Sequence, residues 1–319
     1  MSRFISPITD FGFKKLFGEE ESKEVLKSFL FHILKLESEI TDISFLPQEQ
    51  IPAAEDERLG IYDLYCVDEK GNRFIVEMQR ASQIYFKDRS IYYSTFPIAQ
   101  QAQRGDWDYQ LNAVYCIGLL NFNLVEDKRY IRTAKICDIE TREVFYDKLT
   151  FVYIELPKFS KELNELSNFA EKWIYFLKHL SSLDKIPKEL SEEPMNAAFR
   201  MAEIAAYNEA ERFAYHRSLK RYRDTRGQME YAIIKGREEG REQGIKEGIK
   251  EGREEGREEG REEGALIALR GALLLLLKEK FGEIPQAIER QIESIESSEK
   301  LNLLLTQVVR ATSLTEVEF

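Results

Sequence analysis

Hydrophobic and polar positions alternate most clearly in two runs, residues 61–68 and 73–79, on either side of Gly71. Both runs are rich in β-branched and aromatic residues. A glycine in a three-residue loop can adopt the left-handed conformation that reverses the chain. We therefore predict a β-hairpin that is symmetric about Lys70.

Side chains of a strand point alternately to opposite faces, so the predicted hairpin has two distinct faces. One face is apolar throughout and is expected to lie in the core: Tyr62, Leu64, Cys66, Phe74, Val76 and Met78. The other face places Asp63 opposite Glu77 and Ile61 opposite Gln79. Two carboxylates at one cross-strand pair repel each other at a distance of about 5 Å.

A bound cation would remove this repulsion. Two carboxylates, completed by water and phosphate, commonly hold Mg²⁺ or Mn²⁺ for phosphoryl chemistry. Asp63 and Glu77 are therefore candidate metal ligands, and Asp56 or Glu57 in the preceding polar loop is a candidate for a further one. The alternative is an exposed hairpin whose acids only keep the protein soluble, and the short spacing leaves both interpretations open.

The remaining pattern predicts an α/β region followed by helices alone. Apolar residues recur at helical spacing near the N-terminus, in the middle of the α/β region and after residue 160. Short apolar runs of strand length lie between these segments. We expect helices at 6–36, 80–104, 160–181 and 195–225, and strands at 40–51, 111–120, 130–138 and 149–156.

Glycine occupies every fourth position from Gly236 to Gly264, eight times in all, within charged repeat units. Each interior glycine costs a helix about 1 kcal/mol relative to alanine, so this segment is a weak helix by itself. A flexible charged tether is one interpretation, and a helical tail that brings copies of the chain together is the one we favour. Residues 265–319 are expected to form a terminal helical hairpin that associates with a copy of itself.

Composition changes this picture in two ways. The 319 residues have a formal net charge of −11, so contacts to a nucleic-acid backbone must come from local clusters of Lys and Arg. The candidates are Lys14, Arg89 and the basic, tyrosine-containing segment around Arg217, Lys220 and Arg221. For each of them, an ordinary solvated helix surface is the alternative.

The three cysteines are far apart and form neither a disulfide pattern nor a zinc motif, which is typical of a reducing cytoplasm. The longest apolar run, from Ala265 to Leu277, contains Arg270 and is too short to span a bilayer. The composition therefore predicts a cytoplasmic protein without a membrane segment.

Asp63 together with Glu77-Met-Gln79 resembles the D…ExQ variant of the PD-(D/E)XK nuclease signature. Three segments resemble those of the recombination-promoting nuclease (Rpn) and putative transposase family, namely Thr9-Asp-Phe-Gly-Phe-Lys-Lys-Leu-Phe17, Phe74-Ile-Val-Glu-Met-Gln79 and Arg89-Ser-Ile-Tyr-Tyr-Ser94. The resemblance covers roughly residues 1–225. It implies a Mg²⁺-dependent DNA endonuclease that acts in recombination, transposition or defence against foreign DNA, with Asp63, Glu77 and Gln79 as its catalytic residues.

The resemblance also agrees with the predicted order of elements, an αβββαβ core like that of restriction endonucleases. We expect this core over residues 1–158, a helical region with a basic patch over 159–230, the glycine repeat over 231–264 and the terminal hairpin over 265–319. Gln79 stands where most of the superfamily has a lysine, and an amide can position a water molecule but cannot deprotonate it. A catalytically weak or inactive DNA-binding scaffold, joined into oligomers by its tail, is therefore the alternative function.

Overall fold

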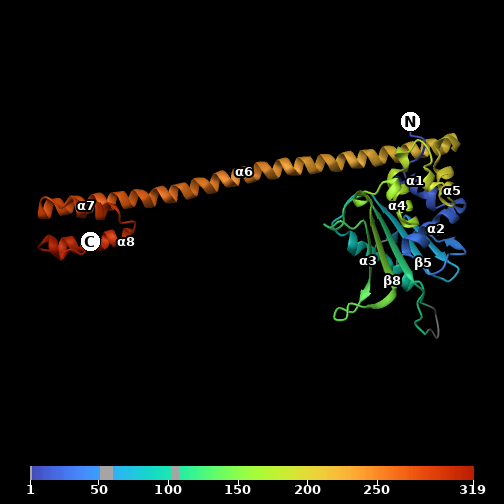
Figure 1. Cartoon of the computed structure of the whole chain (residues 1–319), viewed down its shortest axis with the longest axis horizontal. Coiled ribbons are helices and arrows are strands. Elements are labelled where there is room, and N and C mark those ends of the chain that lie inside the picture. The colour runs from blue at the N-terminus through green and yellow to red at the C-terminus, as the bar shows by residue number, and fades with distance from the viewer. Residues whose placement is uncertain (1, 51–59, 103–107) are drawn as a thin grey trace. The chain divides into compact units, whose positions relative to one another are not determined.

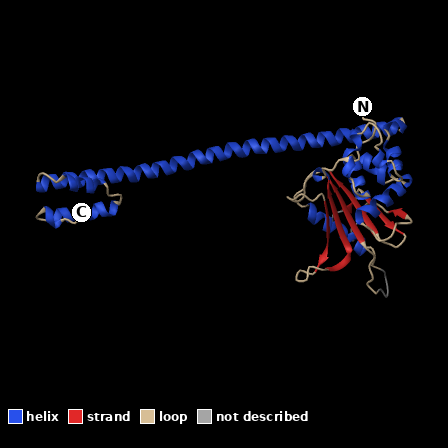
Figure 2. Cartoon of the chain, in the orientation of Figure 1, coloured by secondary structure: helices blue, strands red, loops and turns tan. Residues whose placement is uncertain are grey.

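The computed structural model describes residues 2–50, 60–102 and 108–319. The chain divides into two compact units, Met1–Gln228 and Met229–Phe319, which we call the sheet unit and the tail unit. Figure 1 shows the course of the chain, and Figure 2 its helices and strands.

A six-stranded mixed sheet forms the centre of the sheet unit, with the strand order β1-β4-β5-β6-β8-β7. Strands β5, β6 and β8 are parallel to one another, and the outer pairs are antiparallel. The strands are β1 (Ile43–Phe45), β4 (Leu64–Asp68), β5 (Arg73–Gln79), β6 (Val114–Leu120), β7 (Ile131–Cys137) and β8 (Val144–Glu155). The predicted αβββαβ order is therefore confirmed.

Helices cover both faces of this sheet (Figure 1). The larger core lies between one face and helices α1, α2, α4 and α5, and contains the buried aromatic residues Phe17, Phe29 and Trp173. On the opposite face, α3 packs over β6 and its neighbours. The helices are α1 (Asp10–Phe17), α2 (Lys23–Leu34), α3 (Phe86–Ala99), α4 (Phe169–His179) and α5 (Met195–Ala202).

The β4–β5 hairpin has the predicted symmetric register, with Tyr65 opposite Ile75 and Cys66 opposite Phe74. Gly71 has a φ of 80°, as the loop requires. The Asp68 carboxylate accepts hydrogen bonds from the backbone N–H groups of Lys70 and Asn72 and so stabilises this turn.

Two predictions for the start of the hairpin were wrong. Ile61 does not pair with Gln79 but with Glu49, in a separate ladder of β2 (Glu49–Gln50) and β3 (Gly60–Ile61). Tyr62 lies on the α3 side of the sheet, where its hydroxyl donates a hydrogen bond to the carbonyl of Tyr93. The cause is a bend at Asp63, which separates β3 from β4 and ends the simple alternation of faces.

Several predicted helices are shorter or interrupted. The predicted helix 6–36 is divided at Gly18, and the predicted helix 80–104 begins only at Phe86. The predicted helix 195–225 is interrupted between α5 and α6 (Glu209–Phe281).

The glycine repeat is helical, as predicted, and lies within α6. Its residues from 229 to 264 are all exposed. In the tail unit, the end of α6 packs against α7 (Gln286–Glu293) and α8 (Ser298–Arg310) around Leu273, Leu277, Leu301 and Leu304. None of the described helices contains a stretch that is long and apolar enough to cross a membrane.

Candidate active site

The bend at Asp63 joins the two predicted acids through the backbone. Asp63 Oδ2 accepts a hydrogen bond from the Met78 N–H at 2.7 Å, and the Asp63 N–H donates to Glu77 Oε1 at 3.2 Å. The carboxylate of Asp63 is therefore bonded to the strand that carries Glu77, and the carboxylate of Glu77 to the backbone of Asp63 itself. These reciprocal bonds fix the two carboxylates at one place on the sheet.

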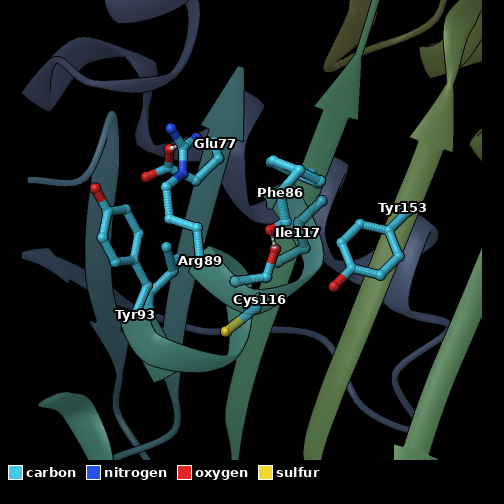
Figure 3. Close-up of a pocket in the computed structure, with 10 residues that line it drawn as sticks. Glu77, Phe86, Arg89, Tyr93, Cys116, Ile117 and Tyr153 are labelled. Atoms are coloured by element: carbon cyan, nitrogen blue, oxygen red, sulfur yellow. Dashed lines mark hydrogen bonds and ion pairs between the residues drawn. The ribbon is translucent and has the colours of Figure 1, made fainter. Parts of the chain in front are cut away.

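Glu77 is not the exposed surface acid of the alternative interpretation, because only 15% of its side chain is accessible to solvent. It borders a small pocket of about 20 Å³ between α3 and the sheet (Figure 3). Most of the pocket wall is apolar, and it includes Ile75, Phe86, Tyr93, Cys116, Ile117 and Tyr153.

Burial in these surroundings and the nearby charge of Asp63 raise the pKa of Glu77 to about 8. Arg89 and the hydrogen bond from the Asp63 N–H act in the opposite direction. Burial also raises the pKa of Asp63, and the bond from the Met78 N–H opposes that shift. Ionisation of either acid is therefore unfavourable in these surroundings unless a positive charge compensates it.

Three charged residues outside the predicted acid pair act on Asp63. Asp10, the first residue of α1, raises the pKa of Asp63, whereas Arg80 and Lys14 lower it. Arg80 is fixed by a hydrogen bond from its Nε to the carbonyl of Ile8 at 2.9 Å. The sequence predicts Lys14 as a contact to DNA but indicates neither Asp10 nor Arg80 as part of the site, although Asp10 lies inside the motif from Thr9 to Phe17.

Arg89 reaches Glu77 from α3 (Figure 3). Its Nη2 donates to Gln79 Oε1 at 2.6 Å and lies 3.5 Å from Glu77 Oε2. Its Nη1 donates to Gln83 Oε1 at 2.8 Å. The structure therefore brings together four predicted residues from two elements and the bend, namely Asp63, Glu77, Gln79 and Arg89.

The beginning of α6 packs close to the end of β5. The N–H of Asn121 donates to the carbonyl of Gln79 at 2.9 Å, and the side chain of Asn121 donates to the hydroxyl of Tyr222 at 3.2 Å. Tyr215 and Ser218 accept hydrogen bonds from backbone N–H groups next to and within α1.

The basic residues of this helix face elsewhere. Arg217, Lys220 and Arg221 occupy exposed positions between the anchoring residues of α6. Within the described part of the chain, none of the three forms a hydrogen bond or ion pair with the acid pair.

Asp63 and Glu77 are two of the few oxygen ligands that a metal ion needs. Among the described residues, no group of three or more His, Cys, Asp or Glu side chains is arranged to hold a metal ion. The candidate ligands Asp56 and Glu57 lie outside the described residues.

The model of the PD-(D/E)XK nuclease family transposases matches residues 7–232, which is more than two thirds of the chain. No curated protein and no solved structure matches the chain significantly. The match includes the sheet, both acids and the three motif segments. The chain therefore belongs to the PD-(D/E)XK nuclease family transposases.

Proposed function

We propose that the protein is a Mg²⁺-dependent DNA endonuclease, which hydrolyses phosphodiester bonds in recombination, transposition or defence against foreign DNA. The observation that carries this proposal is the reciprocal bonding of Asp63 and Glu77, which holds two partly desolvated carboxylates together at the end of β5. A pair that only kept the surface soluble would not need to be buried or joined in this way.

The donor set fits a hard divalent cation. Carboxylate oxygens are preferred ligands of Mg²⁺, which also retains water and binds phosphate oxygens. Burial raises the pKa of both Asp63 and Glu77, and a bound cation would favour their ionised forms, which supports this proposal. Mn²⁺, which also favours oxygen ligands, is expected to substitute.

In this proposal Asp63 and Glu77 hold the cation, which when bound lowers the pKa of water and polarises the phosphate. The bond from the Met78 N–H orients the Asp63 carboxylate, and the wall of the pocket under α3 shields Glu77 from solvent. Gln79 is the third residue of the site. Both ends of its amide are bonded within the protein, because Oε1 accepts from Arg89 and Nε2 donates to the carbonyl of Ala81.

DNA is the proposed partner. Lys14 and Arg89 lie near the acids and are proposed to bind the phosphates closest to the cleaved bond. Arg217, Lys220 and Arg221 are exposed on α6 and are proposed to follow the DNA backbone farther away.

We also propose that the protein acts in the cytoplasm as a homo-oligomer joined through its C-terminal helices. Apolar side chains remain exposed on the tail unit, among them Leu275, Leu303 and Val309. A second copy of the tail unit would bury them.

One observation favours the second candidate, a weakly active or inactive DNA-binding scaffold. The guanidinium of Arg89 lies 3.5 Å from Glu77 and provides positive charge where a cation is needed. If Arg89 compensates Glu77 permanently, the acids have little affinity for a divalent ion.

Cleavage of supercoiled plasmid DNA with Mg²⁺ separates the two candidates. The endonuclease proposal expects cleavage by the wild type and a loss of at least about 100-fold with Asp63→Ala or Glu77→Ala. Lys185→Ala, which changes a charge outside the site, is the control. Equal cleavage by the wild type and Asp63→Ala would contradict the assignment of the site. Absence of Mn²⁺ binding by calorimetry at millimolar concentration would favour the scaffold.

A further inference from the structure

We propose that Gln79 is a positioning residue whose side chain holds the guanidinium of Arg89, and that Arg89 binds a phosphate of the DNA strand beside Asp63 and Glu77. This inference rests on the proposed function, because it assumes that DNA reaches the acid pair.

The first step concerns the amide of Gln79. Its Oε1 accepts a hydrogen bond of 2.6 Å from Arg89 Nη2, and its Nε2 donates a bond of 3.1 Å to the carbonyl of Ala81. The bond to Ala81 fixes the orientation of the amide, so that its oxygen faces the guanidinium. Because both ends of the Gln79 amide are already bonded within the protein, the amide is better placed to hold Arg89 than to position a free water molecule.

The second step concerns the strength of the two contacts that share Arg89 Nη2. The bond to the neutral amide of Gln79 is short, at 2.6 Å, whereas the nearest Glu77 oxygen is 3.5 Å away. A guanidinium that served mainly to neutralise Glu77 would form two short parallel bonds with the carboxylate. Gln79 therefore holds Arg89 back from a closer pair with Glu77.

The third step concerns the fixed position of Arg89. Its Nη1 donates to Gln83 Oε1 at 2.8 Å, and the guanidinium carbon lies 5.6 Å and 5.4 Å from the ring centres of Phe86 and Tyr93. These contacts fix a planar, rigid group on several sides. The side chain nevertheless remains 28% exposed.

The fourth step concerns the donors that remain. A guanidinium has five N–H groups. Within the described part of the chain, the contacts to Gln79, Glu77 and Gln83 account for three of them at most. Arginine binds phosphate oxygens with charge-assisted bonds, often two at once. A phosphate held by the remaining donors would lie next to the proposed cation ligand Glu77.

Replacement of Gln79 should therefore act through Arg89. Without the amide oxygen, the guanidinium is expected to move toward Glu77, its nearest remaining acid, and away from the DNA. The consequence is weaker DNA binding even when no divalent cation is present. A residue that only positioned the attacking water would affect cleavage and leave this binding unchanged.

The test is a double-mutant cycle on the full-length protein. Binding of a short fluorescein-labelled DNA duplex is measured by anisotropy in EDTA, over a range of salt concentrations, for the wild type, Gln79→Leu, Arg89→Ala and the double variant. Gln110→Leu is the matched control, because it makes the same substitution at an exposed position away from the site. Gln79 is at the end of β5, whereas Gln110 precedes the beginning of β6, which runs parallel to β5.

We expect each single substitution to weaken binding about tenfold and the double variant to bind no more weakly than Arg89→Ala. Loss of one phosphate contact should reduce the slope of log K against log salt concentration by about 0.9 in all three variants. The proposal would be overturned if the two single losses multiplied in the double variant. It would also be overturned if Arg89→Ala bound DNA as tightly as the wild type. Thermal unfolding verifies that each variant is folded, and Gln79→Asn, with its shorter amide, replaces Gln79→Leu if the latter is not.

Plasmid cleavage in Mg²⁺ tests the proposed function separately. Cleavage that requires Asp63, combined with independent losses in the cycle, would refute only the role of Gln79. Coupled losses in the cycle without cleavage would support the role of Gln79 and refute the nuclease. Absence of wild-type binding to DNA would overturn the phosphate contact of Arg89.

Discussion

Glycine is required by the surrounding structure at positions of the sheet unit but not in the repeat of the tail unit. In the sheet unit, a Cβ atom added to Gly12 would lie 2.1 Å from the carbonyl oxygen of Ser6, and Gly71 adopts a φ of 80°. In the repeat of the tail unit, a Cβ atom added at any glycine from Gly236 to Gly264 would meet nothing within 4 Å.

Ion pairs also differ between the two units, because they are buried by tertiary contacts in the sheet unit and exposed on the helix in the tail unit. Glu155 and Lys158 are almost completely buried in the sheet unit and lie 2.6 Å apart. Glu242 and Lys246 form an ion pair of 2.7 Å in the repeat, with 69% and 72% of their side chains exposed. Similar residues are thus constrained by tertiary contacts in one region and only by the helix itself in the other.

The largest effect is expected from the buried pair. Lys158→Met should reduce the free energy of unfolding by about 3–5 kcal/mol, because it leaves the fully buried Glu155 without its cationic partner. Urea unfolding monitored by tryptophan fluorescence measures this loss through the buried Trp173. A loss below about 1 kcal/mol would show that the pair is no more constrained than an exposed one.

Gly12→Ala should destabilise the sheet unit by about 2–3 kcal/mol, because the added methyl group collides with the backbone of Ser6. The same urea experiment measures the effect. Gly227→Ala, a helical glycine with nothing within 4 Å of the added atom, is the control. Equal stability of the two variants would show that the close approach of Ser6 to Gly12 does not restrict the side chain at this position.

Glu77→Gln should become more stable relative to the wild type as the pH rises. The pKa of Glu77 is about 8 in the folded protein and near 4.5 when unfolded, so ionisation of Glu77 costs folding stability as the pH rises from about 4.5 to 8. The substitution removes this cost, so the stability gained over the wild type should be smallest at pH 5 and largest at pH 9.

Thermal unfolding in EDTA at pH 5 and pH 9 measures this change for Glu77→Gln and for Glu258→Gln, an exposed residue of the repeat. The difference between Glu77→Gln and the wild type should grow with pH. A difference that stays constant would contradict the burial of an uncompensated charge at Glu77.

Gly252→Ala should have the opposite sign to Gly12→Ala. The added methyl group meets nothing, and alanine favours an exposed helix by about 1 kcal/mol over glycine. Hydrogen exchange of the amides around residue 252 should therefore become about fivefold slower. Faster exchange would indicate that another chain packs against the glycine positions of the repeat.

The smallest effect is expected for Lys246→Met, which removes an exposed ion pair worth about 0.3–0.5 kcal/mol. Exchange of the nearby amides should increase by less than about threefold. A larger change would show that Lys246 has a partner outside its own helix.

The sequence by itself determined the elements whose cause is local. Gly71 and the alternating residues around it specified the β4–β5 hairpin and its register, because turn geometry and side-chain alternation act between near neighbours. The order of helices and strands was predictable from similarly local patterns, and the hairpin register brings Glu77 within hydrogen-bond distance of the Asp63 N–H.

Only the tertiary structure decided the bend at Asp63, because it depends on a hydrogen bond from Met78 in the neighbouring strand. The placement of Tyr62 follows from that bend. The same holds for the charges around the acids. Asp10 comes close to Asp63 because α1 packs beside the sheet, whereas Arg80 directly follows β5 and is held by its bond to the carbonyl of Ile8.

The bond between Gln79 and Arg89 joins a strand to the helix that follows it. The sequence contained both residues but not the distance between them. That distance depends on how α3 packs over the sheet, through contacts of Phe86 and Tyr153 in the core beneath the helix. Local patterns determine which element a residue belongs to, whereas packing determines which side chains meet.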